Sequence, residues 1–275
     1  MKIVCEICPR KCALNEGQTG FCHARVNRGD VILCENYGRV TSLALDPIEK
    51  KPLRRFYPES KILSVGSYGC NMDCAYCQNC EIARADGSSI LWEMISPEAL
   101  VALAEEYRPQ GNIGLAFTYN EPLIGYEYVL DCAKLAKSRG LKIVLVTNGM
   151  IEPNPWERLL PFVDAANIDL KAFSQEGYRT LGGDFETVKA AIAQAQGKIH
   201  LELTTLIVPG FNDDDDTMRA EAAWISSVSP EIPLHLSRFF PRHRMKDASA
   251  TPAETILRLA KIARAHPSYV YSGNM

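Results

Sequence analysis

The stretch YGCNMDCAYCQNC, residues 68–80, decides how this chain of 275 residues is interpreted. It places Cys70, Cys74 and Cys77 at C-x-x-x-C-x-x-C spacing in one short loop. Three thiolates this close together can each bind one iron of a [4Fe–4S] cluster, which four cysteines ordinarily hold. A cluster with only three protein ligands keeps one iron open for another molecule. The aromatic Tyr76 lies just before the last cysteine, where its ring can shield the cluster.

Two other uses of these cysteines, a zinc site and disulfide bonds, agree less well with the spacing. Zinc sites usually combine two C-x-x-C pairs that lie farther apart in the sequence. The apolar run KILSVGS at 61–67 precedes the loop and ends in a glycine turn, which predicts a strand leading into it. Cys80 offers a fourth thiol, and a fourth ligand would close the cluster. We place Cys80 outside the ligand set.

Composition indicates a globular protein with a sizeable core. Hydrophobic residues make up 47% of the chain and charged residues 23%, which is ordinary for a globular domain. The net charge of −3 argues against a general nucleic-acid binder, for which a basic surface is expected. We find no apolar run long enough to cross a bilayer and no signal-peptide core at the N-terminus. Ten cysteines without a secretion signal lead us to expect a cytoplasmic protein that uses cysteine for metal or redox chemistry.

A second group of cysteines lies near the N-terminus, where we expect a small metal-binding section. Cys5, Cys8, Cys12 and Cys22 lie among turns in CEICPRKCALNEGQTGFC. A structural zinc ion and an auxiliary iron–sulfur cluster both accept four such ligands. Spacing alone does not separate the two, and we favour zinc slightly. Four unligated thiols are the weaker alternative, because so short a segment has little core of its own.

From residue 61 onward, strand-like and helix-like runs alternate, which is typical of a parallel α/β architecture. The predicted strands are 61–66, 112–118, 141–147, 165–171, 199–208 and 233–239, with a further short strand at 268–271. The predicted helices are 96–107, 125–139, 156–160, 184–196, one after 212, and 251–265. Six strand–helix units are too few for a closed eightfold barrel. The segment 43–58, rich in lysine, arginine and proline, is predicted to be a solvated connection.

Polar residues follow several predicted strands at the end where βα barrels hold their reactive groups. Glu121 follows the second strand, Asn148 follows the third, and Lys171 ends the fourth. The sixth strand carries His235 and Arg238, which we consider for contact with substrate. Polar side chains from several strands on one rim indicate a shared polar ligand. The plainer alternatives are an ion pair between Glu121 and Lys171, and a hydrogen-bonded core position for His235.

Six motifs of this chain belong together: SVGSYGCNMDCAYCQN, FTYNEPL, VTNGM, IDLKAF, IVPGFND and LHLSRFFP. As a set they resemble the glycyl-radical-enzyme-activase branch of the radical S-adenosylmethionine (radical SAM) superfamily. The opening CEICPRKC, the segment YGRVTSLALDPIEKKPL and the final YVYSGNM are more similar to the AmmeMemoRadiSam system radical SAM enzyme. The resemblance covers nearly the whole chain. It implies a partial (β/α)6 radical SAM barrel over 61–243, a cysteine-rich section and connection over 1–60, and a helix and strand packed on the barrel over 244–275.

Carried over position by position, the resemblance implies cofactor-binding roles beyond the cysteines. Glu121 stands at the acid of the activases' G-G-E motif, which takes the methionine ammonium of SAM; this chain reads Y-N-E there. Asn148 matches a T-N-G motif near the ribose of SAM. Lys171 matches a D-L-K lysine that faces the methionine carboxylate or the substrate. Tyr76 would approach the adenine.

The resemblance implies a radical SAM oxidoreductase with a [4Fe–4S] cluster and SAM as cofactors. Ferredoxin or flavodoxin would supply an electron, and SAM would be cleaved to a 5′-deoxyadenosyl radical that takes a hydrogen atom from a substrate the sequence does not identify. One alternative is an activase that acts on a glycyl radical enzyme as its partner. Another is a non-catalytic iron–sulfur or zinc module for binding or electron transfer, with Cys80 as a fourth ligand. The family label also implies AMMECR-like and Memo-like companions.

Overall fold

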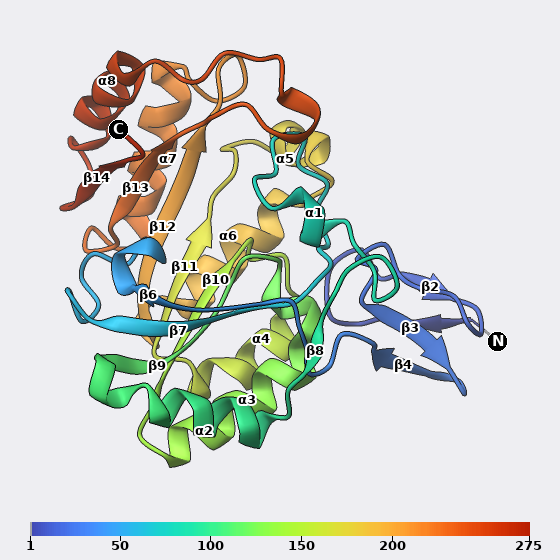
Figure 1. The fold of residues 1–275 in the computed structure, drawn as a ribbon. Coiled ribbons are helices and arrows are strands. Elements are labelled where there is room, and N and C mark those ends of the chain that lie inside the picture. The colour runs from blue at the N-terminus through green and yellow to red at the C-terminus, as the bar shows by residue number, and fades with distance from the viewer. Residues whose placement is uncertain (1) are drawn as a thin grey trace.

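The computed structural model describes residues 2–275, and its central element is an eight-stranded sheet (Figure 1). The strand order is β14-β13-β12-β11-β10-β9-β7-β6. These strands are β6 Ser42–Pro47, β7 Lys61–Gly66, β9 Asn112–Phe117, β10 Lys142–Thr147, β11 Ala165–Asp169, β12 His200–Ile207, β13 Leu234–Arg238 and β14 Val270–Gly273. All neighbours from β7 to β14 pair in parallel, and β6 alone pairs antiparallel, with β7. The predicted parallel α/β architecture is confirmed.

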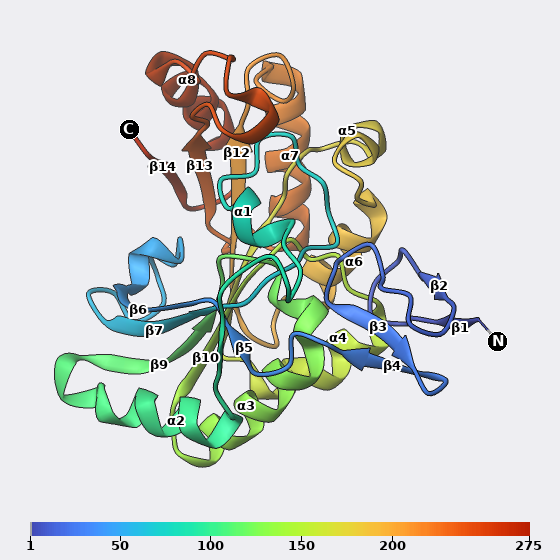
Figure 2. The same ribbon diagram turned by 45° about the vertical axis from the view of Figure 1, so that its right-hand side comes forward.

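Helices connect the parallel strands and lie along the outer face of the curved sheet (Figure 2). They are α2 Pro97–Glu106, α3 Tyr126–Ser138, α4 Pro153–Leu159, α5 Gln175–Thr180, α6 Phe185–Ala195, α7 Asp215–Val228 and α8 Ala253–Ala263. The side chains of Ser96, Asp184 and Asp214 cap α2, α6 and α7 by accepting a backbone hydrogen bond from three residues on. The sequence did not predict α5, because its 6 residues are too few to show helical periodicity.

The segment before the first parallel strand belongs to the sheet, which corrects the prediction of a solvated connection. β6 pairs with β7 along its whole length, from Ser42 opposite Gly66 to Pro47 opposite Lys61. The segment 48–60 then packs where the parallel strands begin, and its Ile48 and Leu53 side chains are fully buried. The boundary predicted at residue 60 therefore lies between two paired strands. The division at residues 60 and 243 stays a prediction.

The cysteine-rich N-terminal section lies beside this sheet and is the dark blue region in Figure 1. It contains two antiparallel pairs, β1 Ile3–Val4 with β2 Ala13–Leu14, and β3 Arg25–Arg28 with β4 Val31–Cys34. A third pair joins β5 Arg39–Val40 to β8 Glu93–Met94. Arg25 attaches the section to α3 through an ion pair with Glu127, with 2.7 Å between Nη2 and Oε1. Within residues 2–275 no helix is long and apolar enough to cross a membrane.

Candidate active site

A cavity of about 300 Å³ lies where the parallel strands end. Cys70, Cys74 and Cys77 all line it, because the loop of residues 68–80, here called the cysteine loop, follows β7 directly. Its other walls come from the residues that end or follow β9, β10, β11, β12 and β13. Small-molecule sites typically have volumes of roughly 300–1,000 Å³. The cavity is therefore large enough for a ligand beside the three thiols.

The three cysteines are partly buried. Burial raises the pKa of Cys70, of Cys77, and of Cys74 to about 11. Because metals bind the thiolate form, a bound metal would have to offset this cost. Cys80 is the first residue of α1 Cys80–Ala83 and is not part of the cavity wall.

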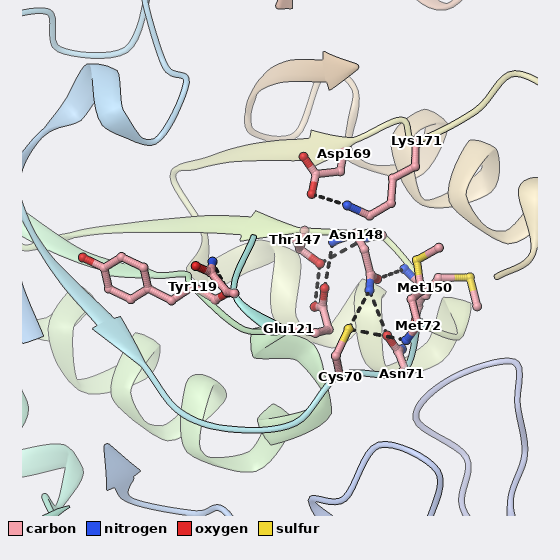
Figure 3. A network of polar contacts seen from close by, with 12 residues as sticks. Cys70, Asn71, Met72, Tyr119, Glu121, Thr147, Asn148, Met150, Asp169 and Lys171 are labelled. Atoms are coloured by element: carbon pink, nitrogen blue, oxygen red, sulfur yellow. Dashed lines mark hydrogen bonds and ion pairs between the residues drawn. The ribbon is translucent and has the colours of Figure 1, made fainter. Parts of the chain in front are cut away.

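Glu121 lies at the centre of a hydrogen-bond network in the cavity wall (Figure 3). Its carboxylate accepts from Thr147 Oγ1 at 2.7 Å, from the Asn148 N–H at 2.8 Å and from the Leu123 N–H at 2.9 Å. Burial raises the pKa of Glu121 to about 7, and these hydrogen bonds limit the rise. An ionised carboxylate has about four acceptor positions. One acceptor position of Glu121 is therefore free for a cationic ligand.

Lys171 follows β11 and lines the same cavity (Figure 3). Its Nζ lies 2.8 Å from Oδ2 of Asp169, so it pairs with Asp169 rather than with Glu121. Burial disfavours the charged amine, but the Asp169 carboxylate keeps the pKa of Lys171 well above its usual value. The cavity wall therefore contains a fixed cation, Lys171, in addition to the Glu121 carboxylate.

The loop before Glu121 has a backbone conformation that glycine usually adopts, although the residue there is tyrosine. Tyr119 has φ +72°, in the left-handed region that non-glycine residues rarely adopt. Its hydroxyl donates to Asp46 Oδ2 of β6 at 2.8 Å, which anchors the side chain away from the cavity centre. Asn120 accepts from the Ser67 N–H at 2.9 Å and donates to the Tyr68 carbonyl at 3.1 Å. Asn120 thereby ties this loop to the start of the cysteine loop.

Asn148 connects the Glu121 network to the cysteine loop (Figure 3). Its Nδ2 donates to Oδ1 of Asn71 at 2.9 Å and lies 3.7 Å from Sγ of Cys70. Because its N–H also donates to Glu121, Asn148 joins the ends of β9 and β10 to the residues that would hold a cluster.

Within residues 2–275, two hydroxyl groups in the cavity wall have no hydrogen-bond partner. They belong to Tyr76 of the cysteine loop and Thr204 of β12, and both oxygen atoms are buried. An unpartnered buried polar group costs about 1–3 kcal/mol. A polar ligand in the cavity would remove that cost. Three thiols, a carboxylate, a cation and two free hydroxyls on one cavity therefore fit a cluster with an open iron and a polar, zwitterionic cofactor.

The structure does not bring His235 and Arg238 to the cavity wall. His235 Nε2 lies 2.5 Å from Oε2 of Glu202, and this contact turns the ring toward the end of the sheet where the strands begin. Arg238 ends β13, but its Nε donates to the Thr251 carbonyl at 2.8 Å. Each of these two side chains makes one hydrogen bond within the protein. Their contact with substrate stays a prediction.

Other residues of the cavity wall were not anticipated from the sequence. They include Asn79, Arg84, Thr118, Ser237 and Asn274. Asn274 follows β14, which extends the parallel sheet beside β13 and brings the last residues of the chain to the rim. The sequence could have indicated Asn274, because it follows a predicted strand, as Glu121 does.

The four N-terminal cysteines lie around a second, smaller cavity of about 10 Å³. Cys5, Cys8, Cys12 and Cys22 all line it, together with Asn71 of the cysteine loop. Among residues 2–275, no three histidine, cysteine, aspartate or glutamate side chains converge closely enough to hold a single metal ion. The four thiols are therefore gathered around one space rather than meeting at a point.

A family model described as the radical SAM superfamily matches residues 64–221, more than half of the chain. The chain belongs to the radical SAM superfamily. Membership implies a [4Fe–4S] cluster and SAM, and the matched residues contain the cysteine loop, Glu121, Asn148 and Lys171. The radical SAM assignment and the relation to activating enzymes are confirmed, whereas the AmmeMemoRadiSam label stays a resemblance.

Relatives of known sequence support this assignment. An uncharacterized protein of Methanocaldococcus jannaschii is 39% identical over 280 residues, which cover 100% of this chain and 82% of that protein. The pyruvate formate-lyase 1-activating enzyme of Escherichia coli K12 is 28% identical over 156 residues, 54% of this chain and 62% of the enzyme. A radical SAM methyltransferase from Sphaerobacter thermophilus shares the fold, with a TM-score of 0.58 and 19% identity over 80% of this chain and 68% of its own. QueE from Escherichia coli shares it at a TM-score of 0.54 and 14% identity, over 85% and 92%.

Proposed function

We propose that this radical SAM protein is an enzyme that cleaves SAM reductively and takes a hydrogen atom from a substrate. One observation carries the proposal: three cysteines at radical SAM spacing line the same cavity as a buried carboxylate and a fixed cation. Cys70, Cys74 and Cys77 would hold the cluster. The position of Cys80 outside the cavity wall supports a set of three thiols rather than four.

When bound, the cluster and SAM supply the reductive cleavage that gives methionine and a 5′-deoxyadenosyl radical, while the protein positions the reactants. Glu121 would accept a hydrogen bond from the methionine ammonium through its free acceptor position. Lys171 would face the methionine carboxylate or the substrate, since its own carboxylate partner, Asp169, keeps it cationic. Asn148 would face the ribose, and Tyr76 the adenine. Opposite charges on one wall match the zwitterionic amino-acid part of SAM.

The reaction requires an electron from outside the chain. Protein iron–sulfur clusters have reduction potentials from about −700 to +450 mV, and this cleavage needs the low end of that range. We therefore propose a low-potential donor such as ferredoxin or flavodoxin, in the cytoplasm. AMMECR-like and Memo-like proteins are proposed companions on the resemblance alone.

A second candidate is an activase that takes its hydrogen atom from a glycine of a partner protein. The 28% identity with a pyruvate formate-lyase 1-activating enzyme favours it. A glycyl radical signal that appears in paramagnetic resonance only when protein, SAM, reductant and a glycyl radical enzyme are combined would decide for it. If SAM cleavage proceeds without any such signal, a different substrate is indicated.

The direct test of SAM cleavage is anaerobic reconstitution with iron and sulfide, addition of reductant and SAM, and chromatographic measurement of 5′-deoxyadenosine. We expect product from the wild type and none from Cys74→Ala, because the cluster loses a ligand. Cys132→Ala is the matched control, since Cys132 is buried in α3 away from the cavity. No wild-type product, or full product from Cys74→Ala, would overturn the proposal.

Cys80→Ser separates the enzyme from a non-catalytic module. The proposal expects this variant to keep both its cluster and its product. If the substitution removes the cluster, and SAM leaves the wild-type cluster spectrum unchanged, the chain is an electron-transfer or binding module.

A further inference from the structure

The N-terminal cysteines form a site that is separate from the proposed active site. Cys5, Cys8 and Cys22 are buried, Cys12 is partly exposed, and all four line one cavity. The Cys5 N–H donates to the Cys12 carbonyl at 3.0 Å, and the Lys11 N–H donates to the Cys8 carbonyl at 3.1 Å. These hydrogen bonds fold the segment 5–12 into a compact turn, so three of the four thiols come from one small structure.

The four thiols do not converge in the way that the ligands of one zinc ion do. Zinc bound by cysteine lies about 2.3 Å from each sulfur. Among residues 2–275, no three histidine, cysteine, aspartate or glutamate side chains could hold a single metal ion, although these four cysteines line one cavity. Four cysteines also hold [2Fe–2S] and [4Fe–4S] clusters, in which inorganic sulfides and several irons separate the ligands. This arrangement therefore favours a cluster over the zinc ion that the sequence slightly favoured.

Arg25 provides an independent sign of an anionic occupant. It lines the same cavity, its side chain is only 5% exposed, and its Nε has no hydrogen-bond partner in the part of the chain that the structure describes. Its two other guanidinium nitrogens are occupied by Glu127 and the Ile124 carbonyl. A buried, unpartnered N–H on a cation favours an anionic acceptor, and cluster sulfides and thiolates are such acceptors.

The cysteine loop and the N-terminal cavity are in direct contact. Asn71, which follows Cys70, lines the N-terminal cavity together with Cys8. On the other side of Cys70, Gly69 has φ +90°, and a Cβ there would clash with the Cys22 carbonyl oxygen. Only glycine permits this approach. The residues on both sides of Cys70 therefore touch the N-terminal site.

We propose that Cys5, Cys8, Cys12 and Cys22 bind a second iron–sulfur cluster next to the cysteine loop. With four protein ligands this cluster has no open iron, so it does not bind SAM. The chain would then carry one open and one closed cluster. The presence of the closed cluster does not depend on whether the protein cleaves SAM.

The test uses a variant that keeps only the N-terminal site, Cys70→Ala/Cys74→Ala/Cys77→Ala, in the full chain. After anaerobic reconstitution we expect about four irons and four sulfides per chain, or about two of each for [2Fe–2S]. The reduced protein should give a paramagnetic resonance signal that SAM does not change. Zinc without iron, or neither metal, would overturn the proposal.

Two further substitutions in this background locate the cluster. Adding Cys12→Ala should remove most of the remaining iron, and Cys12 is the most exposed of the four cysteines, so the fold is least disturbed. Adding Cys34→Ala should leave the iron in place, since Cys34 lies in the same section but does not line the cavity. Far-ultraviolet circular dichroism checks that each variant is folded. If the Cys12→Ala variant contains as much iron per chain as the Cys34→Ala control, the assignment of the cluster to these four cysteines is wrong.

The outcome is distinguishable from that of the proposed function. Iron and sulfide in the triple variant, without 5′-deoxyadenosine from the wild type, would keep the second cluster and reject SAM cleavage. Product from the wild type, with neither iron nor sulfide in the triple variant, would do the reverse.

Discussion

A buried glutamate lies at each end of the parallel strands, and the two differ in how many of their hydrogen-bond acceptor positions the protein fills. Where the parallel strands end, Glu121 lines an open cavity and keeps an acceptor position free. Where they begin, the carboxylate of Glu202 is completely buried and receives hydrogen bonds from four groups of the protein. Both ends therefore hold a buried glutamate. What separates a ligand-binding carboxylate from a structural one is how far the protein has already satisfied it.

Glu202 closes its end of the sheet by joining three segments. Its oxygens accept from the N–H groups of Arg54 and Arg55 at 3.0 and 2.8 Å, and from Nε2 of His200 at 2.9 Å. The fourth contact is with His235 of β13. The segment 48–60 is thus held across the start of the strands, opposite the proposed active site.

The largest effect is expected from Glu202→Ala. Removing one partner of a buried charged network costs about 3–5 kcal/mol, because the remaining donors lose their acceptor. We expect the free energy of unfolding to fall by about that amount in urea or guanidinium titrations. The surface substitution Glu106→Ala, on the exposed end of α2, should change it by less than about 0.5 kcal/mol. A loss below about 1 kcal/mol for Glu202→Ala would show that the closed end is not held by this carboxylate.

A smaller effect concerns acid pH. Burial by itself would raise the pKa of Glu202, but hydrogen bonds from His200, His235 and two backbone N–H groups lower it from 4.5 to about 2. Because the folded pKa lies below the unfolded one, the stabilisation is present above about pH 4.5 and is lost as the pH falls toward about 2. One pKa unit corresponds to about 1.4 kcal/mol, so at most about 3.5 kcal/mol of stability depends on this ionisation.

Glu202→Gln provides the measurement, since glutamine does not titrate. The difference in unfolding free energy between wild type and Glu202→Gln should be constant near neutral pH and should shrink as the pH falls from about 4.5 toward 2. A difference that stays constant over this range would mean that Glu202 is not ionised in the way its contacts imply.

The contrast also explains which parts of the molecule could be predicted from sequence. Strands such as β7 and β10 are apolar runs bounded by glycine or polar residues, so local pattern was enough. The three cluster cysteines are close in sequence, and because the loop is short, their side chains lie near one another at one site. β6 was missed because its burial does not alternate regularly and it ends in a proline, which weakens the strand pattern.

Side-chain partners across strands could not be predicted in the same way. His235 stands opposite Thr204 in the register of β12 and β13, yet its ring reaches Glu202, a residue that no local pattern connects with it. Likewise, Lys171 pairs with Asp169, the last residue of β11 and two positions before it, whereas charge alone suggested Glu121. Sequence indicates which residue types are present. Strand register and side-chain direction then decide which of them remain available to a ligand.

The sharpest test of the contrast is Glu121→Gln. Glutamine keeps the shape of the side chain but lacks the negative charge that would face the methionine ammonium. A hydrogen bond to a charged group contributes about 1.5–3 kcal/mol, so SAM should bind about 10- to 150-fold more weakly. The measurement is anaerobic titration calorimetry with SAM and reconstituted protein. Stability should fall less than in Glu202→Gln, because burial raises the pKa of Glu121 and its ionised form therefore contributes less to folding than that of Glu202.

The control is the same substitution at the other end, Glu202→Gln. It should lower the free energy of unfolding while leaving the affinity for SAM as in the wild type, because Glu202 has no contact with the cavity. The two variants should therefore show crossed effects, affinity for one and stability for the other. If Glu121→Gln instead lowers stability as much as Glu202→Gln and leaves SAM binding unchanged, Glu121 is a structural residue. A free acceptor position would then be insufficient to identify a ligand-binding carboxylate in this fold.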